Sequence, residues 1–238
     1  MIDTHCHLLP AIDDGTRDDA EALELARELV EAGVHHVVCT PHFSRRFPTD
    51  NRAAEDRLGH LRGLLDGAGV ALGLGLAAEV APGTATEAPV AELRARRLGE
   101  EHLLVELEPD TPSGFIELAL ARVGELGLTP VFGHPERCRA ARSQPRILDA
   151  ARRAGALLQV VAPSLTGRWG GEAADAAWQL LESGRVDLLA SDSHRANRDA
   201  EYLERAVELV SARLGAETLL ELTEHGPARV AGVAPHPA

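Results

Sequence analysis

The sequence predicts an α/β fold in which parallel strands close into a barrel surrounded by helices. Short apolar runs alternate with amphipathic segments in about seven strand–helix units, and such alternation is typical of parallel strands joined by right-handed crossovers. The length of 238 residues suits one barrel-sized domain. Residues with reactive side chains follow several apolar runs, as they do at the carboxyl ends of barrel strands.

The first half of the chain contains three of these units. Its predicted strands are Ile2–Cys6, His36–Thr40 and Val70–Ala78, and its predicted helices are Arg17–Ala32 and Arg52–Asp66. A polar loop is predicted at Phe43–Asp50. The strands are short apolar runs of the buried type. The helices carry apolar residues at the helical spacing. Gly33 marks the end of the first, and Gly67 and Gly69 mark the end of the second.

The second half repeats the alternation and ends in helices. Its predicted strands are Leu103–Val105, Thr129–Gly133, Leu157–Val161 and Val186–Ser191, and its predicted helices are Phe115–Leu126, Pro145–Ala154, Ala173–Ser183, Arg198–Leu214 and Ala216–Glu224. No linker or low-complexity tract divides the chain, so we expect one domain over residues 1–231. The Pro-rich end, with Pro227, Pro235 and Pro237, predicts a loose carboxyl-terminal tail at residues 232–238.

The composition excludes several classes of function. The formal net charge of −13 argues against a nucleic-acid partner, whose phosphates require a basic surface. All 24 basic residues are arginines, so lysine Schiff-base chemistry and a Walker-type phosphate loop are excluded. Three cysteines form no disulfide framework, and neither a leader nor a run long enough to span a membrane is evident. We therefore expect a cytoplasmic protein without membrane insertion.

Histidines and acidic residues gather where the predicted strands end. If the first strand is extended, His5 and His7 point to the same side. Alone, such a pair would be read as surface residues, but nine side chains share this placement: His5, His7, Asp14, His42, Glu79, Glu106, His134, Asp192 and His194. The other histidines lack it and are expected to be structural or solvated: His35, His36, His60, His102, His225 and His236. The pattern predicts a metal centre.

The size and charge of this set indicate what the centre binds. Each metal site uses three or four protein ligands, so nine ligands with bridging carboxylates suit two or three divalent ions. Three such ions would leave the pocket net positive inside an acidic protein. A compact anion, most simply a phosphate ester, is the ligand that such a pocket selects.

Seven segments of the chain resemble the polymerase-and-histidinol-phosphatase (PHP) superfamily. They are Ile2–His7, Ile12–Gly15, Thr40–His42, Glu79, Val105–Glu106, Gly133–Arg137 and Ala190–His194. Within the superfamily, the opening motif and the His134-Pro135-Glu136-Arg137 turn are similar to the bacterial metal-dependent protein-tyrosine phosphatases of capsule and exopolysaccharide loci. The resemblance covers roughly residues 1–231, and its opening motif is the most specific part.

The resemblance implies a distorted (β/α)7 barrel of the TIM-like PHP type with a trinuclear centre. It implies three sets of ligands: His5, His7, Glu79 and Asp192; Glu79, Glu106 and His134; and Asp14, His42 and His194. Manganese is the implied metal, although mixed His and carboxylate ligands also accept iron or zinc. The implied reaction is hydrolysis of phosphotyrosine on a protein, a bacterial tyrosine kinase of polysaccharide biosynthesis being the expected substrate.

The chemistry of the site suggests how phosphate is attacked and held. A water activated by divalent ions attacks phosphorus in line, and guanidinium groups neutralise the phosphate oxygens. We nominate Arg137 and Arg198 as this clamp, with Arg195 as the alternative to Arg198. A phenolate leaves readily, so no general acid is named.

Other functions stay open at this stage. A PHP phosphatase of histidinol phosphate or another small metabolite would use the same centre, and only the rim could differ. The loop Phe43–Thr49, with Arg45, Arg46 and Phe47, could hold a phosphotyrosyl peptide but is not diagnostic. A PHP nuclease is disfavoured by the charge, and a non-catalytic metal-stabilised binding module by the complete ligand set.

Cys39 and Arg45 match the C-x5-R spacing of cysteine-dependent tyrosine phosphatases. That chemistry needs a loop whose backbone N–H groups point at phosphate. The intervening residues include no glycine, and Pro41 lacks an N–H. We therefore expect no cysteine chemistry here.

Overall fold

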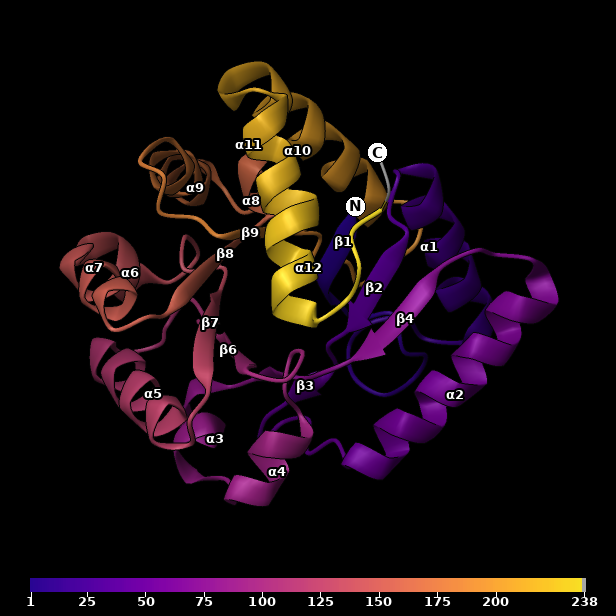
Figure 1. Ribbon diagram of the computed structural model, residues 1–238, viewed down its shortest axis with the longest axis horizontal. Helices are drawn as coiled ribbons and strands as arrows, with labels where there is room; N and C mark the ends of the chain where they lie inside the picture. The colour runs from indigo at the N-terminus through magenta and orange to yellow at the C-terminus, as the bar shows by residue number, and fades with distance from the viewer. Residues whose placement is uncertain (237–238) are drawn as a thin grey trace.

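The computed structural model describes residues 1–236, in which parallel strands form two adjoining sheets (Figure 1). The strands are β1 Ile2–Cys6, β2 His36–Cys39, β3 His42–Phe43, β4 Gly73–Leu76, β5 Glu79–Val80, β6 His102–Glu106, β7 Thr129–Gly133, β8 Leu157–Val161 and β9 Leu188–Ala190. One sheet has the order β1-β2-β4 and the other the order β3-β5-β6-β7-β8-β9, with parallel pairing throughout. A parallel bridge between Cys6 and Ser193 joins the end of β1 to the segment after β9.

Helices surround the strands in Figure 1. They are α1 Asp19–Glu31, α2 Asn51–Ala68, α3 Pro82–Glu87, α4 Val90–Ala95, α5 Ser113–Glu125, α6 Arg139–Ser143, α7 Arg146–Arg153, α8 Ala162–Leu165, α9 Gly171–Glu182, α10 Asp199–Leu214, α11 Ala216–Leu220, a π-helix at Glu221–His225, and α12 Gly226–Ala231. Helix α1 illustrates how they form: the Asp18 side chain caps its amino terminus by accepting a hydrogen bond from Glu21, and an apolar face that includes Leu25 and Leu29 is buried.

Helix α12 lies across the amino-terminal end of the strands (Figure 1). A Cβ on Gly99, just before β6, would meet the Val230 carbonyl at 2.2 Å, and one on Gly226 would meet the Asp187 carbonyl, just before β9, at 2.9 Å. Val230 belongs to a small apolar cluster inside the ring of strands: Val38, Ala77, Leu98, Leu104, Val131, Leu188 and Val230. The carboxyl-terminal ends of the strands are therefore left open for the site.

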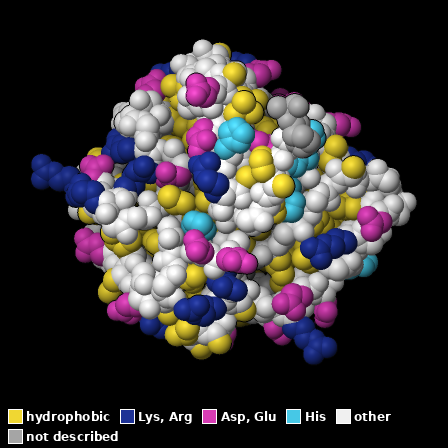
Figure 2. Space-filling view, in the orientation of Figure 1, with side chains coloured by type: hydrophobic (Ala, Val, Ile, Leu, Met, Phe, Trp, Pro, Cys, Tyr) yellow, Lys and Arg dark blue, Asp and Glu magenta, His cyan; other side chains and the backbone are white. Residues whose placement is uncertain are grey.

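The described part of the face that carries α12 mixes basic, acidic and apolar side chains, and no basic stripe stands out on it (Figure 2). None of the helices within residues 1–236 is long and apolar enough to cross a membrane.

The predicted α/β fold with parallel strands is confirmed, and most predicted elements lie within a few residues of those observed. Two short strands were not predicted. Thr40 and Pro41 separate β2 from the first of them, β3, and the second, β5, lies just beyond the predicted strand Val70–Ala78, of which only β4 is observed. Proline cannot donate to a sheet, so the break between β2 and β3 has a local cause.

The carboxyl-terminal segment also differs from the prediction. Pro227 lies buried in α12. The backbone N–H of Val233 donates to Ala228, and that of His236 donates to Glu224. Residues 233 and 236 are thus held against the body rather than loose; residues 237 and 238, and with them Pro237, lie outside the described part of the chain.

Candidate metal centre

The structure brings together all nine side chains that the sequence singles out. His5 lies in β1, His42 begins β3, Glu79 begins β5 and Glu106 ends β6. His7, His134, Asp192 and His194 follow the ends of β1, β7 and β9, and Asp14 lies in the loop after β1. Because the strands are parallel, these positions converge at one end of the barrel.

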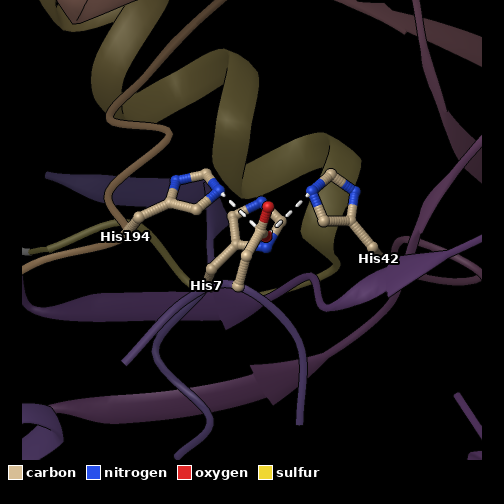
Figure 3. Close-up of side chains that lie close together, drawn as sticks. His7, His42 and His194 are labelled. Atoms are coloured by element: carbon tan, nitrogen blue, oxygen red, sulfur yellow. Dashed lines mark ion pairs between the residues drawn. The ribbon is translucent and has the colours of Figure 1, made fainter. Parts of the chain in front are cut away.

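The imidazole rings lie against one another. The ring of His7 lies 4.0 Å from that of His194, 4.5 Å from that of His42 and 5.5 Å from that of His5, between centroids. Figure 3 shows His7, His42 and His194 converging from three separate segments. His134 completes the set, with its centroid 5.7 Å from that of His5.

The carboxylate of Glu79 lies at the centre of the group and is 1% exposed. Its Oε1 lies 2.9 Å from Nε2 of His134 and 3.3 Å from Nε2 of His5. Its Oε2 lies 2.9 Å from Nδ1 of His42 and 3.4 Å from Nε2 of His7. Each oxygen thus faces two imidazoles, an arrangement suited to a carboxylate that bridges two cations.

Within the described residues, four overlapping groups place one potential ligand atom per residue within 4.8 Å of the others. They are His7, Asp14, His42 and His194; His5, Glu79 and His134; His5, His7 and Asp192; and His42, Glu79 and Glu106. These groups overlap with the implied sets but do not coincide with them. Glu106 groups with His42 rather than with His134, and His134 groups with His5. Glu79 is absent from the group of His5, His7 and Asp192, and His7 also joins the Asp14 group.

Several potential ligand atoms are buried without a hydrogen-bond partner. They are Nε2 of His5, Nε2 of His7, Oδ1 of Asp14, Oε2 of Glu79 and Nδ1 of His134. A buried polar atom without a partner costs about 1–3 kcal/mol, so five of them in one cluster require an explanation. All of these atoms except Nδ1 of His134 face the cluster, where a divalent cation would coordinate them. The residues present therefore fit a metal centre.

A second layer of residues orients two of the imidazoles. Nδ1 of His5 donates to Oε1 of Gln159 at 2.8 Å, and Nδ1 of His7 donates to Oδ2 of Asp13 at 2.8 Å. With Nδ1 protonated, Nε2 of each ring carries the lone pair that a metal requires. Gln159 is fixed in turn by donating to Oγ1 of Thr4 at 2.9 Å.

Neither Gln159 nor Asp13 is among the ligands that the sequence pattern predicts. A signal existed for Gln159, which is the one polar residue in the strand Leu157–Val161. Asp13 stands beside Asp14, and nothing in the sequence separates the ligand from the residue that orients a ligand.

The backbone adopts unusual conformations at the site. His134 and Asp192 have positive φ values of 37° and 53°, which cost about 1–3 kcal/mol each in residues with side chains. Backbone hydrogen bonds hold them: His134 N–H donates to Gln159 at 2.8 Å and Asp192 N–H to His5 at 2.9 Å. In the first loop, a Cβ on Gly15 would come within 2.2 Å of the His7 carbonyl, so only glycine permits this approach.

The carboxylates set the charge of the imidazoles. Burial disfavours the charged form of His5, His42 and His194, but neighbouring carboxylates outweigh it and raise their pKa values to about 9, about 12 and about 9. The pKa of Glu79 falls well below its ordinary value, because His5 and His42 outweigh its burial. Burial and the Glu79 charge raise the pKa of Glu106 to about 8. The cluster therefore attracts positive charge strongly.

Five arginines line the cavity of about 370 Å³ above the cluster, among them the three candidates for the phosphate clamp. Arg137 donates to Oδ2 of Asp192 at 3.0 Å, and its guanidinium lies 4.5 Å from the Trp169 ring centroid. Arg195 donates to the Gly15 carbonyl. Arg198 is exposed at the residue before α10. Arg137 and Arg198, the predicted phosphate clamp, therefore line the same cavity as Arg195, the alternative to Arg198.

Histidines outside the centre have other surroundings. His35 pairs with Glu224 at 2.9 Å and His60 with Asp19 at 2.8 Å. The C-x5-R spacing is not an active site, because burial raises the pKa of the Cys39 thiol to about 12 and Arg45 lies at the surface, paired with Glu87 at 2.7 Å. Cys6, Cys39 and Cys138 are free and buried.

Comparisons with known proteins agree on one family. The family described as "Capsular polysaccharide synthesis, CpsB/CapC" matches residues 1–231. The tyrosine-protein phosphatase YwqE of Bacillus subtilis is 28% identical over 227 residues, covering 94% of this chain and 89% of that protein. The tyrosine-protein phosphatase CpsB of Streptococcus pneumoniae is 24% identical over 240 residues, covering 97% and 98% of the two chains.

Solved structures extend the likeness to the fold. A structure from a study of YwqE and CpsB, described there as unique metal-dependent tyrosine phosphatases, superposes with a TM-score of 0.85 at 26% identity and covers 100% of this chain and 99% of that one. The dihydropyrimidinase of Brevibacillus agri matches with a TM-score of 0.61 at 14% identity, covering 97% of this chain and 70% of that one, which is a likeness of fold alone.

Proposed function

The chain belongs to the CpsB/CapC family of capsular polysaccharide synthesis, and on that premise we propose that it is a metal-dependent protein-tyrosine phosphatase. The observation that carries this proposal is the convergence of nine His, Asp and Glu side chains at one end of the strands, in a fold that superposes over its whole length on metal-dependent tyrosine phosphatases. Its substrate would be a phosphotyrosyl protein, and the family's place in capsule synthesis favours a bacterial tyrosine kinase of polysaccharide biosynthesis.

We further propose that two or three divalent ions, manganese first, occupy the centre. The proposed ligands are His5, His7, Asp14, His42, Glu79, Glu106, His134, Asp192 and His194. Bound ions would act as Lewis acids on the phosphate and lower the pKa of a coordinated water. The distorted (β/α)7 barrel over residues 1–231 and a cytoplasmic location belong to the same proposal.

The chain's own residues contribute position and charge. Glu79, which faces four imidazoles, would supply a carboxylate ligand at the centre of the group. Gln159 and Asp13 keep His5 and His7 in the tautomer that binds metal. Arg137 and Arg198, or Arg195 in place of Arg198, would neutralise phosphate oxygens as charge develops on them. The tyrosyl oxygen leaves readily, because its ordinary pKa is only about 10.

The test measures metal content together with hydrolysis. Protein loaded with Mn²⁺ is assayed on a phosphotyrosyl peptide, histidinol phosphate and single-stranded DNA, and again after chelation. We expect two or three ions per chain, hydrolysis of the phosphotyrosyl peptide in preference to the other two, and loss of activity on chelation.

Two variants distinguish the loss of a proposed ligand from the loss of a histidine outside the metal centre. His194→Ala removes a proposed ligand and is expected to lower kcat by more than about 100-fold and to reduce metal content. His60→Ala removes an exposed histidine that pairs with Asp19 and should change neither. Hydrolysis that persists after the metal is lost would contradict the proposal, and faster turnover of histidinol phosphate would favour a metabolite phosphatase.

A further inference from the structure

Aromatic side chains are rare in this protein, yet they gather at the site. The sequence contains four phenylalanines, two tryptophans and one tyrosine. Three of these seven line the cavity above the metal cluster: Phe47, Trp169 and Tyr202. They come from three distant segments, namely the loop after β3, the loop between α8 and α9, and helix α10. Their convergence therefore cannot follow from a local apolar run.

Phe47 is placed directly against the proposed ligands. Its ring stacks on the imidazole of His42 with centroids 5.3 Å apart and an interplanar angle of 11°. The surrounding turn is fixed, since the N–H of Ser44 donates to the Phe47 carbonyl at 3.0 Å and the N–H of Phe47 donates to Oγ of Ser44 at 3.1 Å. Phe47 is thus a preformed aromatic wall at the edge of the centre.

Trp169 lies far from Phe47 in the sequence and is 43% exposed. Its ring lies 4.5 Å from the guanidinium of Arg137 and 5.0 Å from that of Arg168. Cation–π contact of this kind fixes the orientation of both partners. An exposed tryptophan contributes less to the core than a buried one does, so the stability of the fold does not account for its position.

We propose that Phe47 and Trp169 form an aromatic slot that receives the phenyl ring of the substrate and makes the enzyme selective for aryl over alkyl phosphate esters. The inference rests on the proposed function and names the substrate class of that site. A tyrosyl phosphate lies one ring farther from the peptide backbone than a seryl phosphate. When the phosphate reaches the metal cluster, the ring must therefore lie in the cavity that these two side chains line.

Arg137 connects the slot to the reacting group. It contacts the Trp169 ring and donates to Asp192, a proposed metal ligand. A substrate whose ring lies against Trp169 therefore presents its phosphate to a guanidinium that is already oriented. Contacts made to the ring in both ground and transition states strengthen binding without raising the rate of the chemical step, so the slot should act mainly on KM.

The test compares Phe47→Leu and Trp169→Leu with Phe115→Leu. Phe115 lies on α5, is 38% exposed and does not line the cavity, so it is a matched control. Substrates are a phosphotyrosyl peptide and its phosphoseryl counterpart, together with p-nitrophenyl phosphate and glycerol 2-phosphate. Aromatic contacts of this kind correspond to a rise in KM of roughly 3- to 10-fold for each variant on the aryl esters. We expect this rise in KM to be several-fold larger on the aryl esters than on the alkyl esters, metal content to stay as in the unmodified protein, and Phe115→Leu to change nothing.

A binding measurement makes the test independent of turnover. Phenylphosphonate should bind the Mn²⁺-loaded protein more tightly than methylphosphonate, by calorimetry, and both slot variants should lose this preference. Equal effects of the variants on aryl and alkyl ligands, or no effect on either, would overturn the slot. Absence of hydrolysis of every ester would instead contradict the proposed function, while the phosphonate comparison would still decide the slot.

Discussion

Among single residues, those that orient the proposed ligands offer the sharpest tests. Gln159 hydrogen-bonds to His5 through its side chain and to the backbone N–H of His134 through its carbonyl. It is fully buried between two strands and fixes one tautomer of one imidazole. Its effect on metal binding should therefore be separable from that of a ligand.

Gln159→Leu should lower metal affinity about 10- to 100-fold, because the Nδ1–H of His5 loses its acceptor and the ring loses its fixed orientation. Calorimetric titration of the metal-free protein with Mn²⁺ measures the change. Gln159→Glu keeps an acceptor at the same place and should retain more affinity than the leucine variant. Equal affinities for the leucine variant and the unmodified protein would refute the orienting role.

Gly15→Ala is expected to disrupt the first loop. The added Cβ would lie 2.2 Å from the His7 carbonyl and 2.6 Å from the His7 Cβ, so the backbone that carries His7 and Asp14 must move. Metal content, measured by elemental analysis, should fall by at least one ion per chain. A variant with full metal content would show that the loop has another conformation that serves the site.

All but one of the nine proposed ligands lie close to the point where an apolar run gives way to polar residues, the exception being Asp14 in the first loop. That change is visible in sequence, and parallel topology then brings the strand ends together. Gln159 interrupts a strand rather than ending one, and its role depends on a partner 154 positions away. Such a pairing is fixed by tertiary packing and leaves no local pattern.

At the scale of elements, helix α2 shows what the sequence conceals. Its amino terminus is capped by Asp50, and its buried face includes Leu58, Leu61 and Leu65. Three exposed glycines, Gly59, Gly63 and Gly67, lie on the same helix. Glycine weakens a helix, so packing against the barrel must maintain this one.

Gly63→Ala should raise the free energy of unfolding by about 0.5–1 kcal/mol, because a Cβ there meets nothing within 4 Å and alanine loses less backbone entropy on folding. Urea denaturation with an unchanged m value measures the gain. Gly69→Ala is the matched counterpart. Gly69 ends the helix with φ of 67°, so alanine should be destabilising there. A destabilised Gly63→Ala variant would contradict this account of α2.

Short elements were the ones that sequence patterns failed to predict. Helices α3 and α4 have six residues each, too few to display a helical period, and neither has a side-chain cap. The predicted helix at 216–224 instead continues through a π-helical turn into α12. Its packing beneath the strands, rather than any local preference, determines where it ends.

At the scale of the whole molecule, the two ends of the barrel differ: one is closed by apolar packing and the other carries the proposed metal site. Helix α12 and the apolar cluster around Val230 close the amino-terminal end, and the proposed ligands crowd the other end. The crowding has an energetic consequence, because buried carboxylates and imidazoles in contact require a positive charge to be stable there. Protons supply that charge when metal is absent.

Metal should therefore stabilise the protein more as the pH rises from about 6.5 to about 9. In the metal-free protein, the pKa values of His5 and His194 are about 9, above the ordinary 6.5, because carboxylates favour the charged imidazole over the cost of its burial. Their contribution to stability is complete below pH 6.5 and is lost as the pH rises through 9. Divalent ions bind only neutral imidazoles, so their contribution grows over the same interval.

The measurement is the difference in Tm between Mn²⁺-loaded and chelated protein across that range of pH. Both effects have the same sign, so the difference should widen steadily, and proton release on metal binding should accompany it in calorimetry performed in buffers of different ionisation enthalpy. His60→Ala should follow the unmodified protein, because that histidine lies outside the cluster. A difference in Tm that stays constant or narrows with rising pH would mean that protons and metal do not compete for these imidazoles, and the assignment of His5 and His194 as ligands would fail with it.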